Sequence, residues 1–212
     1  SHGTYSDSNT YPSNHLSFGA YGPSLSSLFY YGYMSNFWLV VGSDVYTINA
    51  ATGASTSFDG SGDSIVTASS SDFAMGTGAF TVEGWFRVGF DTTNSGAKFL
   101  FDLGSNGIKI TITSSLLRLK IGTETHITYN IGTLSQSTFY HIAGTRDGSG
   151  NVKLFLNGTN VASYAGSSYN HTTTQVTIAD HGGTNYYYTG YISNLRIIKG
   201  TAVYTSNFTP PN

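Results

Sequence analysis

The sequence predicts an all-β protein, built as a sandwich of two packed sheets. No window of ten or more residues places apolar side chains at i, i+3, i+4 and i+7, so amphipathic helices are not expected. β-branched and aromatic runs are instead separated by short stretches of Gly, Asn, Asp and Ser, which is typical of strands and turns. Many short strands at close spacing favour a two-sheet sandwich.

Short strands separated by turns are expected throughout residues 55–212. Asn157-Gly158 lies between two apolar runs and predicts a two-residue hairpin turn, because both central residues of such a turn need a positive φ. Residues 147–150 predict a looser hairpin, and Asn106-Gly107 separates two further strands. The expected strands are 64–67, 80–88, 98–102, 107–113, 116–121, 125–130, 139–146, 152–156, 159–164, 175–179 and 188–199.

An internal repeat defines the domain organisation. Residues 32–47 (GYMSNFWLVVGSDVYT) align without a gap with residues 190–205 (GYISNLRIIKGTAVYT), and eight of sixteen positions are identical. Repeats of this kind are typical of tandem arrays. We therefore expect one complete module at 55–212, preceded at 1–54 by the C-terminal portion of another module or by an assembly segment. Within residues 1–54, further strands are expected at 16–18 and 28–33.

A third of a sandwich would expose strand edges and apolar side chains, which seek partners. The missing part can precede the chain in the natural protein, or a neighbouring subunit can supply the missing strands. Alternatively, residues 1–54 pack on the complete module as a short interface element. In the last two cases Phe37 and Trp38 would serve assembly.

The composition excludes several classes of partner. Charged residues make up 9% of the chain, against roughly 25% in an average protein. The net charge is −2 and the nine basic residues are scattered along the sequence, so nucleic-acid binding is not expected. No apolar run approaches the roughly 18 residues of a membrane span, so no membrane partner is expected. A neutral, hydroxyl-rich surface with many short strands fits an exposed, durable all-β protein.

Three segments carry a resemblance to a known family. They are SFDGSGDSIVTASSSDFAMGTGAFTVEGWFRV (57–88), FYHIAGTRDGSGNVKLFLNGTNVAS (139–163) and YYYTGYISNLRIIKGTAVYTSNFTPP (186–211). Together they resemble the laminin-G-like, concanavalin A-like lectin/glucanase family, in the form found in phage virion and bacterial surface proteins. The resemblance implies an antiparallel jelly-roll sandwich. It does not set the function, since the family includes lectins, glycoside hydrolases, protein-binding modules and structural spacers.

The glucanases of this family place acidic residues at alternate positions of one strand, so that two carboxylates flank the scissile bond. The glutamates of this chain are Glu83 and Glu124, and no strand carries that alternating pattern. Glu83 is expected to be a hydrogen-bonded residue beside Trp85. No catalytic residue is assigned, and the protein is expected not to be an enzyme.

The resemblance also implies a calcium site, because some relatives bind Ca²⁺ through Asp and Asn side chains in loops. The candidate ligands are Asp59, Asp63 and Asp102. Relatives often carry Asp-Asp in the closing strand, where this chain has Ser193-Asn194, which removes charge that the cation would need. Turn formation is the alternative explanation of the same residues. No other cofactor is expected.

The loop at 180–188 (DHGGTNYYY) is the best candidate for a glycan site. Sugar recognition needs an aromatic surface for the apolar face of the ring and polar groups for the hydroxyls. The loop offers both kinds of group within nine residues, in Asp180, His181, Asn185, Tyr186 and Tyr187. Alternatively, these tyrosines pack between modules or on the edge of the sandwich.

The function expected from the sequence is therefore attachment or display. The protein is predicted to be a structural component of a virion, such as a phage tail fibre or a capsid decoration. Its partners would be a glycan or protein of the host surface and other virion or fibre subunits, including copies of itself. The alternatives are a bacterial surface adhesin made of tandem modules and a purely structural extracellular filament subunit.

Overall fold

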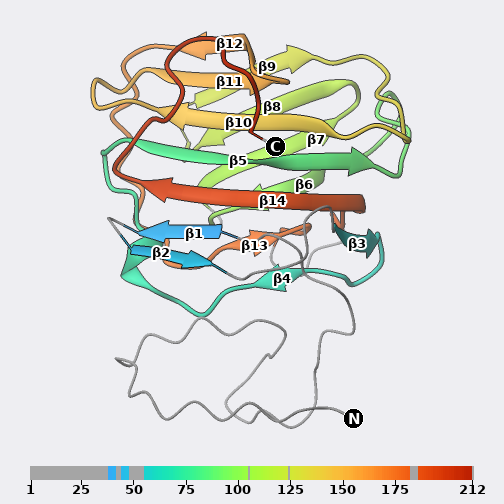
Figure 1. Cartoon of the computed structure of the whole chain (residues 1–212), viewed down its shortest axis with the longest axis horizontal. Helices are drawn as coiled ribbons and strands as arrows, with labels where there is room; N and C mark the ends of the chain where they lie inside the picture. The colour runs from blue at the N-terminus through green and yellow to red at the C-terminus, as the bar shows by residue number, and fades with distance from the viewer. Residues whose placement is uncertain are drawn as a thin grey trace, which may run out of the picture.

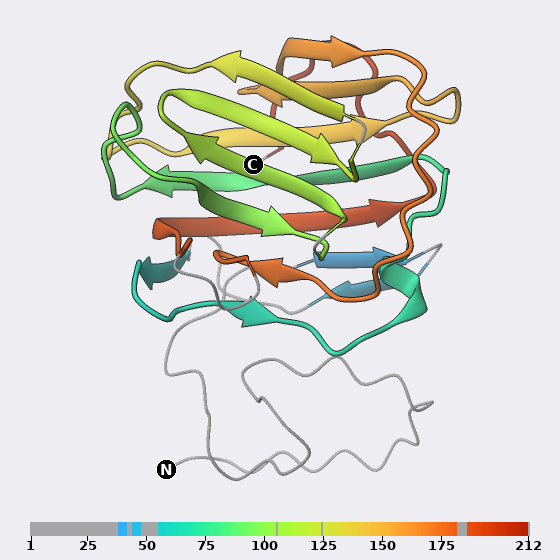
Figure 2. The same ribbon diagram turned by 180° about the vertical axis from the view of Figure 1, so that it is seen from behind.

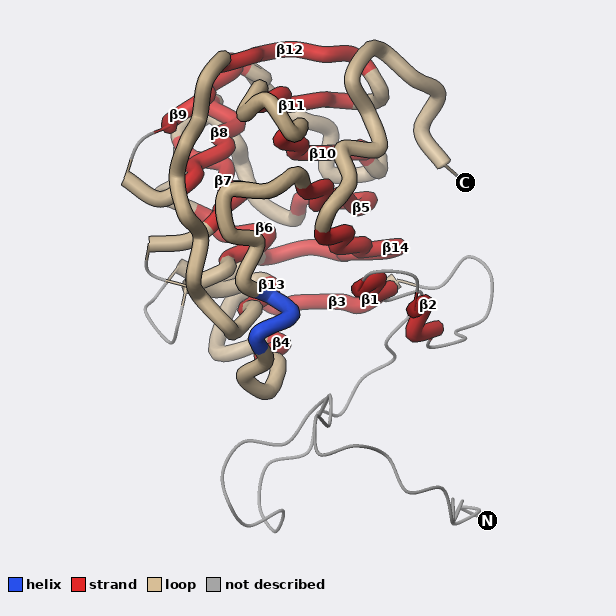
Figure 3. Tube along the Cα trace, turned by 90° about the vertical axis from the view of Figure 1, so that its left-hand side faces the viewer, coloured by secondary structure: helices blue, strands red, loops and turns tan. Residues whose placement is uncertain are grey.

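The protein is a sandwich of two β-sheets, as the sequence predicts. The structure, a computed structural model, describes residues 38–41, 44–47, 55–104, 106–123, 125–181 and 186–211. Seen from the side, the two sheets form two layers that face each other (Figure 3). Among the described residues, the helical structure is one 3₁₀ turn, η1 (Ser71–Phe73). No helix in the described part of the chain is long and apolar enough to cross a membrane.

The first sheet, sheet A, faces the viewer in Figure 1 and contains eight described strands. Its order is β12-β11-β10-β5-β14-β1-β2, and β3 also pairs with β14. The bounds are β1 (Trp38–Val41), β2 (Asp44–Thr47), β3 (Thr56–Asp59), β5 (Phe80–Val88), β10 (Tyr140–Arg146), β11 (Val152–Leu156), β12 (Thr159–Tyr164) and β14 (Thr189–Lys199).

The second sheet, sheet B, lies behind sheet A and faces the viewer in Figure 2. It has six described strands in the order β4-β13-β6-β7-β8-β9. Neighbouring strands in this sheet are antiparallel. The bounds are β4 (Ile65–Val66), β6 (Lys98–Asp102), β7 (Ile108–Thr113), β8 (Leu116–Ile121), β9 (Thr125–Asn130) and β13 (Thr177–Ile178).

Where the predicted ranges lie in the described residues, they agree with the observed strands to within one residue at each end, with one exception. The strand predicted at 175–179 begins two residues later, at Thr177, and ends at Ile178. Asn157 and Gly158 have φ angles of 49° and 77°, which confirms the predicted hairpin turn. The strands β1, β2 and β3 were not among the predicted ranges, and the expected strands at 16–18 and 28–33 lie outside the described residues.

The hydrophobic core fills the space between the two sheets. Val82 and Phe86 contribute from sheet A, and Ile110 and Leu119 contribute from sheet B, each at most 1% exposed. Because side chains alternate along a strand, the residues between these core positions point to the outer faces of the sandwich. Any site on a sheet is therefore built from the alternate residues of its strands.

The edge of sheet A at β14 is completed by the N-terminal part of the chain. β1 pairs parallel to β14, with Trp38 opposite Arg196, and β2 pairs antiparallel to β1. β3 covers the other half of the same edge, with Ile192 opposite Thr56. The β1–β14 pair is the exception to the antiparallel pairing expected for the fold. Phe37 lies outside the described residues, and Trp38 is placed here by its backbone alone.

Candidate functional site

An open pocket of about 380 Å³ lies on the outer face of sheet B. On β7, Ile108, Ile110 and Ile112 are fully buried in the core, so the residues between them face outward into the pocket. β8 alternates in the same way and contributes its outward residues beside those of β7. The pocket is lined by Ala97, Phe99, Lys109, Thr111, Thr113, Arg118, Lys120, His181 and Tyr186.

Three aromatic rings form one wall of the pocket. The His181 ring stacks on the Phe99 ring, with 4.5 Å between the centroids and 8° between the planes. The Tyr186 ring lies 5.5 Å from Phe99 and 6.2 Å from His181, and 42% of Tyr186 is exposed. The wall therefore offers a tyrosine to solvent, supported by two packed rings.

A β-bulge in β6 turns Phe99 toward this wall. Phe99 pairs with Thr111, whereas Phe101 pairs with Ile110, so the register shifts by one residue between them. As a result Leu100 and Phe101 are both buried in the core, while Phe99 lies on the outer face with Thr111. Redirecting a side chain in this way is a common role of bulges near functional sites.

Cations form the floor of the pocket. Lys109 and Lys120 are direct partners across the β7–β8 pair, and Arg118 is the partner of Thr111. The Lys109 ammonium lies 3.7 Å from an Asp102 carboxylate oxygen and 3.3 Å from Nδ1 of His181. The Asp102 carboxylate also contacts the His181 ring. Lys109, His181 and Asp102 therefore hold one another in place at the base of the aromatic wall.

Burial dominates the electrostatics of this group. It raises the pKa of Asp102 above its ordinary value, although the hydrogen bond from His181 and the charge of Lys109 act in the opposite direction. Burial likewise lowers the pKa of Lys109, opposed by the charge of Asp102 and assisted by the charge of Lys120. The ionised carboxylate of Asp102 and the protonated amine of Lys109 are therefore less favoured in the folded protein than in water.

The predicted glycan loop contributes part of this pocket. Of its five candidate residues, His181 and Tyr186 line the pocket, and Asn185 lies outside the described residues. Asp180 is 1% exposed, so it belongs to the interior, and Tyr187 is half-buried. The two ends of the loop meet where the backbone N–H of Tyr188 donates to the carbonyl oxygen of Ala179 over 2.7 Å. The assignment of this loop to glycan binding stays a prediction.

Sequence reasoning missed the strand residues of the pocket. Lys109, Arg118 and Lys120 are separated along the chain and looked like scattered cations. The available signal was the alternation of polar and apolar residues in IKITIT and LLRLKI, on either side of the Ser114-Ser115 turn. A hairpin closed at that turn places residue 109 opposite residue 120.

The predicted calcium ligands lie in two different places. Asp59 and Asp63 stabilise one turn: Asp59 accepts a hydrogen bond from the Ser61 backbone over 2.7 Å, and Asp63 accepts one from the Asp59 backbone over 3.1 Å. Asp102 lies on sheet B, in contact with Lys109 and His181. No group of three His, Asp or Glu residues in the described part of the chain could hold a metal ion. The calcium site stays a prediction.

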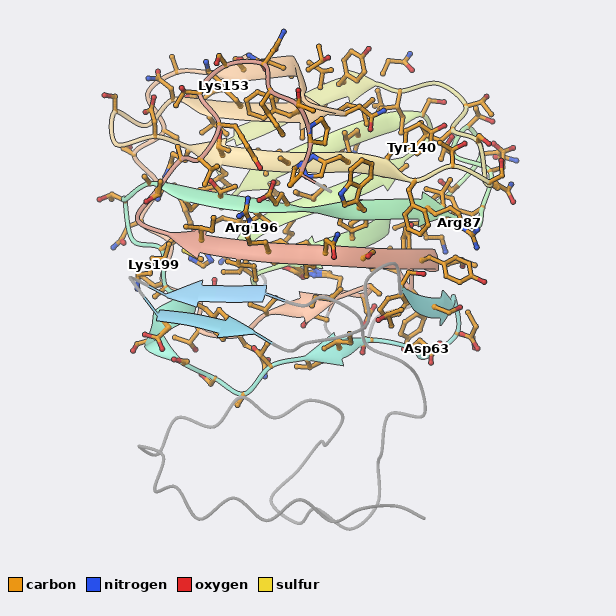
Figure 4. All side chains as sticks on the ribbon, in the orientation of Figure 1. Asp63, Arg87, Tyr140, Lys153, Arg196 and Lys199 are labelled. Atoms are coloured by element: carbon orange, nitrogen blue, oxygen red, sulfur yellow. The ribbon has the colours of Figure 1, made fainter. Side chains whose placement is uncertain are left out.

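A second polar cluster lies on the outer face of sheet A. Glu83 contacts His141 over 3.2 Å and forms an ion pair with Arg196, which is labelled in Figure 4. Burial alone would raise the pKa of Glu83, but hydrogen bonds from His141, Tyr204 and Arg196 and the Arg196 charge outweigh it, and the pKa lies below its ordinary value. Glu83 is therefore a hydrogen-bonded residue, as the sequence predicts.

The C-terminal segment 201–211 covers this cluster and crosses the front of β5 and β10 in Figure 1. The indole N–H of Trp85 donates to the carbonyl oxygen of Pro211 over 3.0 Å, and Thr145 donates to the carbonyl oxygen of Tyr204 over 3.1 Å. Phe208 stacks on Tyr204 with 3.5 Å between the ring centroids. With this cover in place Glu83 is 1% exposed, so its carboxylate is closed off from a substrate in solvent.

The architecture defines the class of protein: a jelly-roll sandwich whose sheets are antiparallel apart from the β1–β14 pair, with an open pocket on one outer face. Residues 59–202 match the family model described as the concanavalin A-like lectin/glucanases superfamily. The chain belongs to this family, and the resemblance stated from the sequence is confirmed. A comparison with curated protein sequences finds no match.

Solved structures with the same fold include the binding domains of botulinum neurotoxins and of Paraclostridial Mosquitocidal Protein 1. The binding domain of botulinum neurotoxin DC in complex with SialylT has a TM-score of 0.55 and 15% identity, and the match covers 73% of this chain and 41% of that chain. The binding domain of Paraclostridial mosquitocidal protein 1 has a TM-score of 0.52 and 14% identity, with 70% and 41% covered. At such identities the likeness shows the fold alone, and it extends over about two-fifths of each toxin chain.

Proposed function

We propose that this protein is a non-enzymatic carbohydrate-binding module of a virion or a surface fibre, which attaches through the pocket on sheet B. The observation that carries the proposal is the wall of Phe99, His181 and Tyr186 in a pocket that Thr111 and Thr113 also line. A sugar ring has an apolar face that packs on an aromatic side chain, and hydroxyls that need polar partners. A volume of about 380 Å³ lies within the range of small-ligand sites.

The family and the similar structures support binding rather than chemistry. Lectins belong to the family. The similar toxin structures include complexes with SialylT and with rat synaptotagmin II, and cell entry of botulinum neurotoxin type C depends on interaction with two ganglioside molecules. In this chain Glu83 is 1% exposed, and its carboxylate is held by His141 and Arg196. These observations support a module that binds a glycan without cleaving it.

A place on a virion is supported by the sequence. The resemblance extends to phage virion proteins, and the chain has few charges and an internal repeat. In that setting the module would serve as part of a tail fibre or a capsid decoration that contacts the host surface. A bacterial adhesin of tandem modules would use the same pocket. A purely structural filament subunit would instead bury Tyr186 against a neighbouring subunit.

The test is a glycan array probed with the wild-type protein, Tyr186→Ala and Tyr164→Ala. Tyr164 is a matched control, because it is 43% exposed and lies on β12 of sheet A, away from the pocket. We expect the wild type to bind a defined set of glycans, Tyr186→Ala to lose at least about tenfold in affinity, and Tyr164→Ala to bind normally. The proposal fails if no glycan binds the wild type, or if the two variants lose binding equally.

A further inference from the structure

We propose that the pocket on sheet B selects anionic glycans, in which a carboxylate or sulfate group on the sugar is bound by Arg118 and Lys120. This inference rests on the proposed function, since it names the ligand class of the same pocket. Three of the nine basic residues of the chain line this one pocket, although they are spread over 12 positions of the sequence. The register of the β7–β8 hairpin brings them together.

The first argument is the arrangement of like charges. Lys109 and Lys120 lie directly opposite each other across an antiparallel pair, where two equal charges destabilise a sheet. Burial lowers the pKa of Lys109, and the charge of Lys120 acts in the same direction. An anion bound from solvent would relieve this repulsion, so the pair is readily explained as part of an anion-binding site.

The second argument is the distribution of the opposite charge. The one acidic side chain in contact with these cations, among the described residues, is Asp102, which is 2% exposed and faces Lys109 and His181. Neither Arg118 nor Lys120 forms an ion pair with a described carboxylate, and the buried Nε of Arg118 has no hydrogen-bond partner among the described residues. Arg118 and Lys120 are therefore the cations of the pocket available to a ligand.

The third argument is the match between these groups and a charged sugar. A guanidinium and an ammonium donate several hydrogen bonds to a carboxylate or a sulfate, and charge-assisted bonds of this kind are stronger than neutral ones. The aromatic wall lies next to the cations: the Lys109 ammonium is 5.7 Å from the centre of the Phe99 ring. A sugar ring on Tyr186 would carry its anionic group toward Arg118 and Lys120.

The test is calorimetric titration with matched pairs of saccharides: a galactose and a galacturonic acid trisaccharide, and lactose with and without a sulfate group. We expect the anionic member of at least one pair to bind at least about tenfold more tightly, with an affinity that falls as salt rises from about 0.05 to 0.5 M. In Arg118→Gln and Lys120→Gln this preference should fall to within about threefold. Lys199→Gln on sheet A removes the same charge elsewhere and should keep the preference.

The outcomes separate this inference from the proposed function. If neutral and charged saccharides bind alike, and Arg118→Gln and Lys120→Gln change nothing, the anionic class is wrong while glycan binding stands. If none of these saccharides binds while the wild type binds glycans of the array, the anionic class is wrong; if no glycan of the array binds either, both proposals fall. A short single-stranded oligonucleotide serves as a third probe. Binding of this probe more tightly than any saccharide, without loss in Tyr186→Ala, would mean that the pocket recognises charge alone and would overturn the glycan class.

Discussion

At the scale of single residues, Tyr188 illustrates how apolar packing outweighs a polar group. Its fully buried ring makes edge contacts with Phe58, Phe86 and Phe90, with centroids 5.9 to 6.5 Å apart. Its hydroxyl has no hydrogen-bond partner among the described residues, and burial raises its pKa far above the ordinary value. The aromatic contacts stabilise the core, while the buried hydroxyl opposes them.

We therefore expect Tyr188→Phe to raise the free energy of unfolding by about 1 kcal/mol, because it removes a buried hydroxyl without changing the ring. Tyr169→Phe is the matched control: the Tyr169 hydroxyl donates to the carbonyl oxygen of Asn106 over 2.7 Å, so its loss should lower stability by about 1 kcal/mol. Urea unfolding measures both. A destabilised Tyr188→Phe protein would mean that the hydroxyl has a partner in solution.

Glu83 predicts a pH dependence of stability. Its pKa is lowered in the folded protein, so its ionised form stabilises the fold above the unfolded pKa, and this stabilisation is lost as the pH falls through the folded pKa. The loss should therefore begin below about pH 4.5 and continue on further acidification.

In Glu83→Gln we expect a protein about 3 kcal/mol less stable at pH 7, because Arg196 loses its buried partner. The difference from the wild type should shrink as the pH falls below about 4.5, since protonation then removes the same charge from the wild type. Urea midpoints at pH 7, 5 and 3 measure this. Both proteins contain all the other carboxylates. A difference in the free energy of unfolding that stays constant with pH would therefore contradict the lowered pKa of Glu83.

At the scale of elements, the β7–β8 hairpin determines the pocket. Its two turn residues, Ser114 and Ser115, have φ angles of 44° and 67°, a conformation that serine adopts less readily than asparagine or glycine. The Ser115 backbone N–H donates to the carbonyl oxygen of Thr92 over 2.6 Å, and that of Ser114 to the carbonyl oxygen of Ser95 over 3.2 Å. The contacts of the loop at 92–95 therefore help to hold an unfavourable turn.

The double substitution Ser114→Asn/Ser115→Gly should raise the free energy of unfolding by about 1 kcal/mol, because asparagine and glycine both suit a positive φ. The backbone donors of the turn are retained, and neither position lines the pocket, so glycan affinity should stay unchanged. Urea unfolding together with titration of a bound glycan measures the two quantities. A loss of stability would indicate that the serine hydroxyls matter more than the backbone, since Ser114 also donates to Ser95 through its side chain.

Local signals account for what could be predicted from the sequence at this scale. Asn157-Gly158 needs no tertiary context to form its turn, and the alternation within a strand shows which residues share a face. The loop that carries His181 and Tyr186 was recognised because its aromatic and polar residues are adjacent in sequence. The bulge that turns Phe99 outward has no comparable local signal. The meeting of Lys109 with Lys120 depends on register, which the alternation predicts only once the position of the turn at Ser114-Ser115 is known.

At the scale of the whole molecule, the two copies of the internal repeat fold in part into different structures. β1 pairs in parallel with β14 so that Trp38, Leu39 and Val40 lie opposite residues 158 positions later, which are the residues that the repeat aligns with them. β2 (Asp44–Thr47) is a strand, whereas its counterpart 202–205 runs without strand structure across the outer face of sheet A. Nearly the same residues therefore take different structures, because their neighbours differ.

The β1–β14 pair predicts where a cross-link will form. Val40 and Ile198 are register partners, and neighbouring strands lie about 4.8 Å apart, so a cysteine at each position meets the distance requirement of a disulfide. The chain has no cysteine of its own, so the engineered pair is free of competing thiols. If residues 1–54 complete sheet A within one chain, Val40→Cys/Ile198→Cys should form a disulfide at the mass of a single chain on a non-reducing gel. Leu39→Cys/Ile198→Cys, one residue out of register, should form much less.

A cross-linked dimer would instead mean that a neighbouring subunit donates β1. That is one of the assemblies considered from the sequence, and the pairing within one chain would then be wrong.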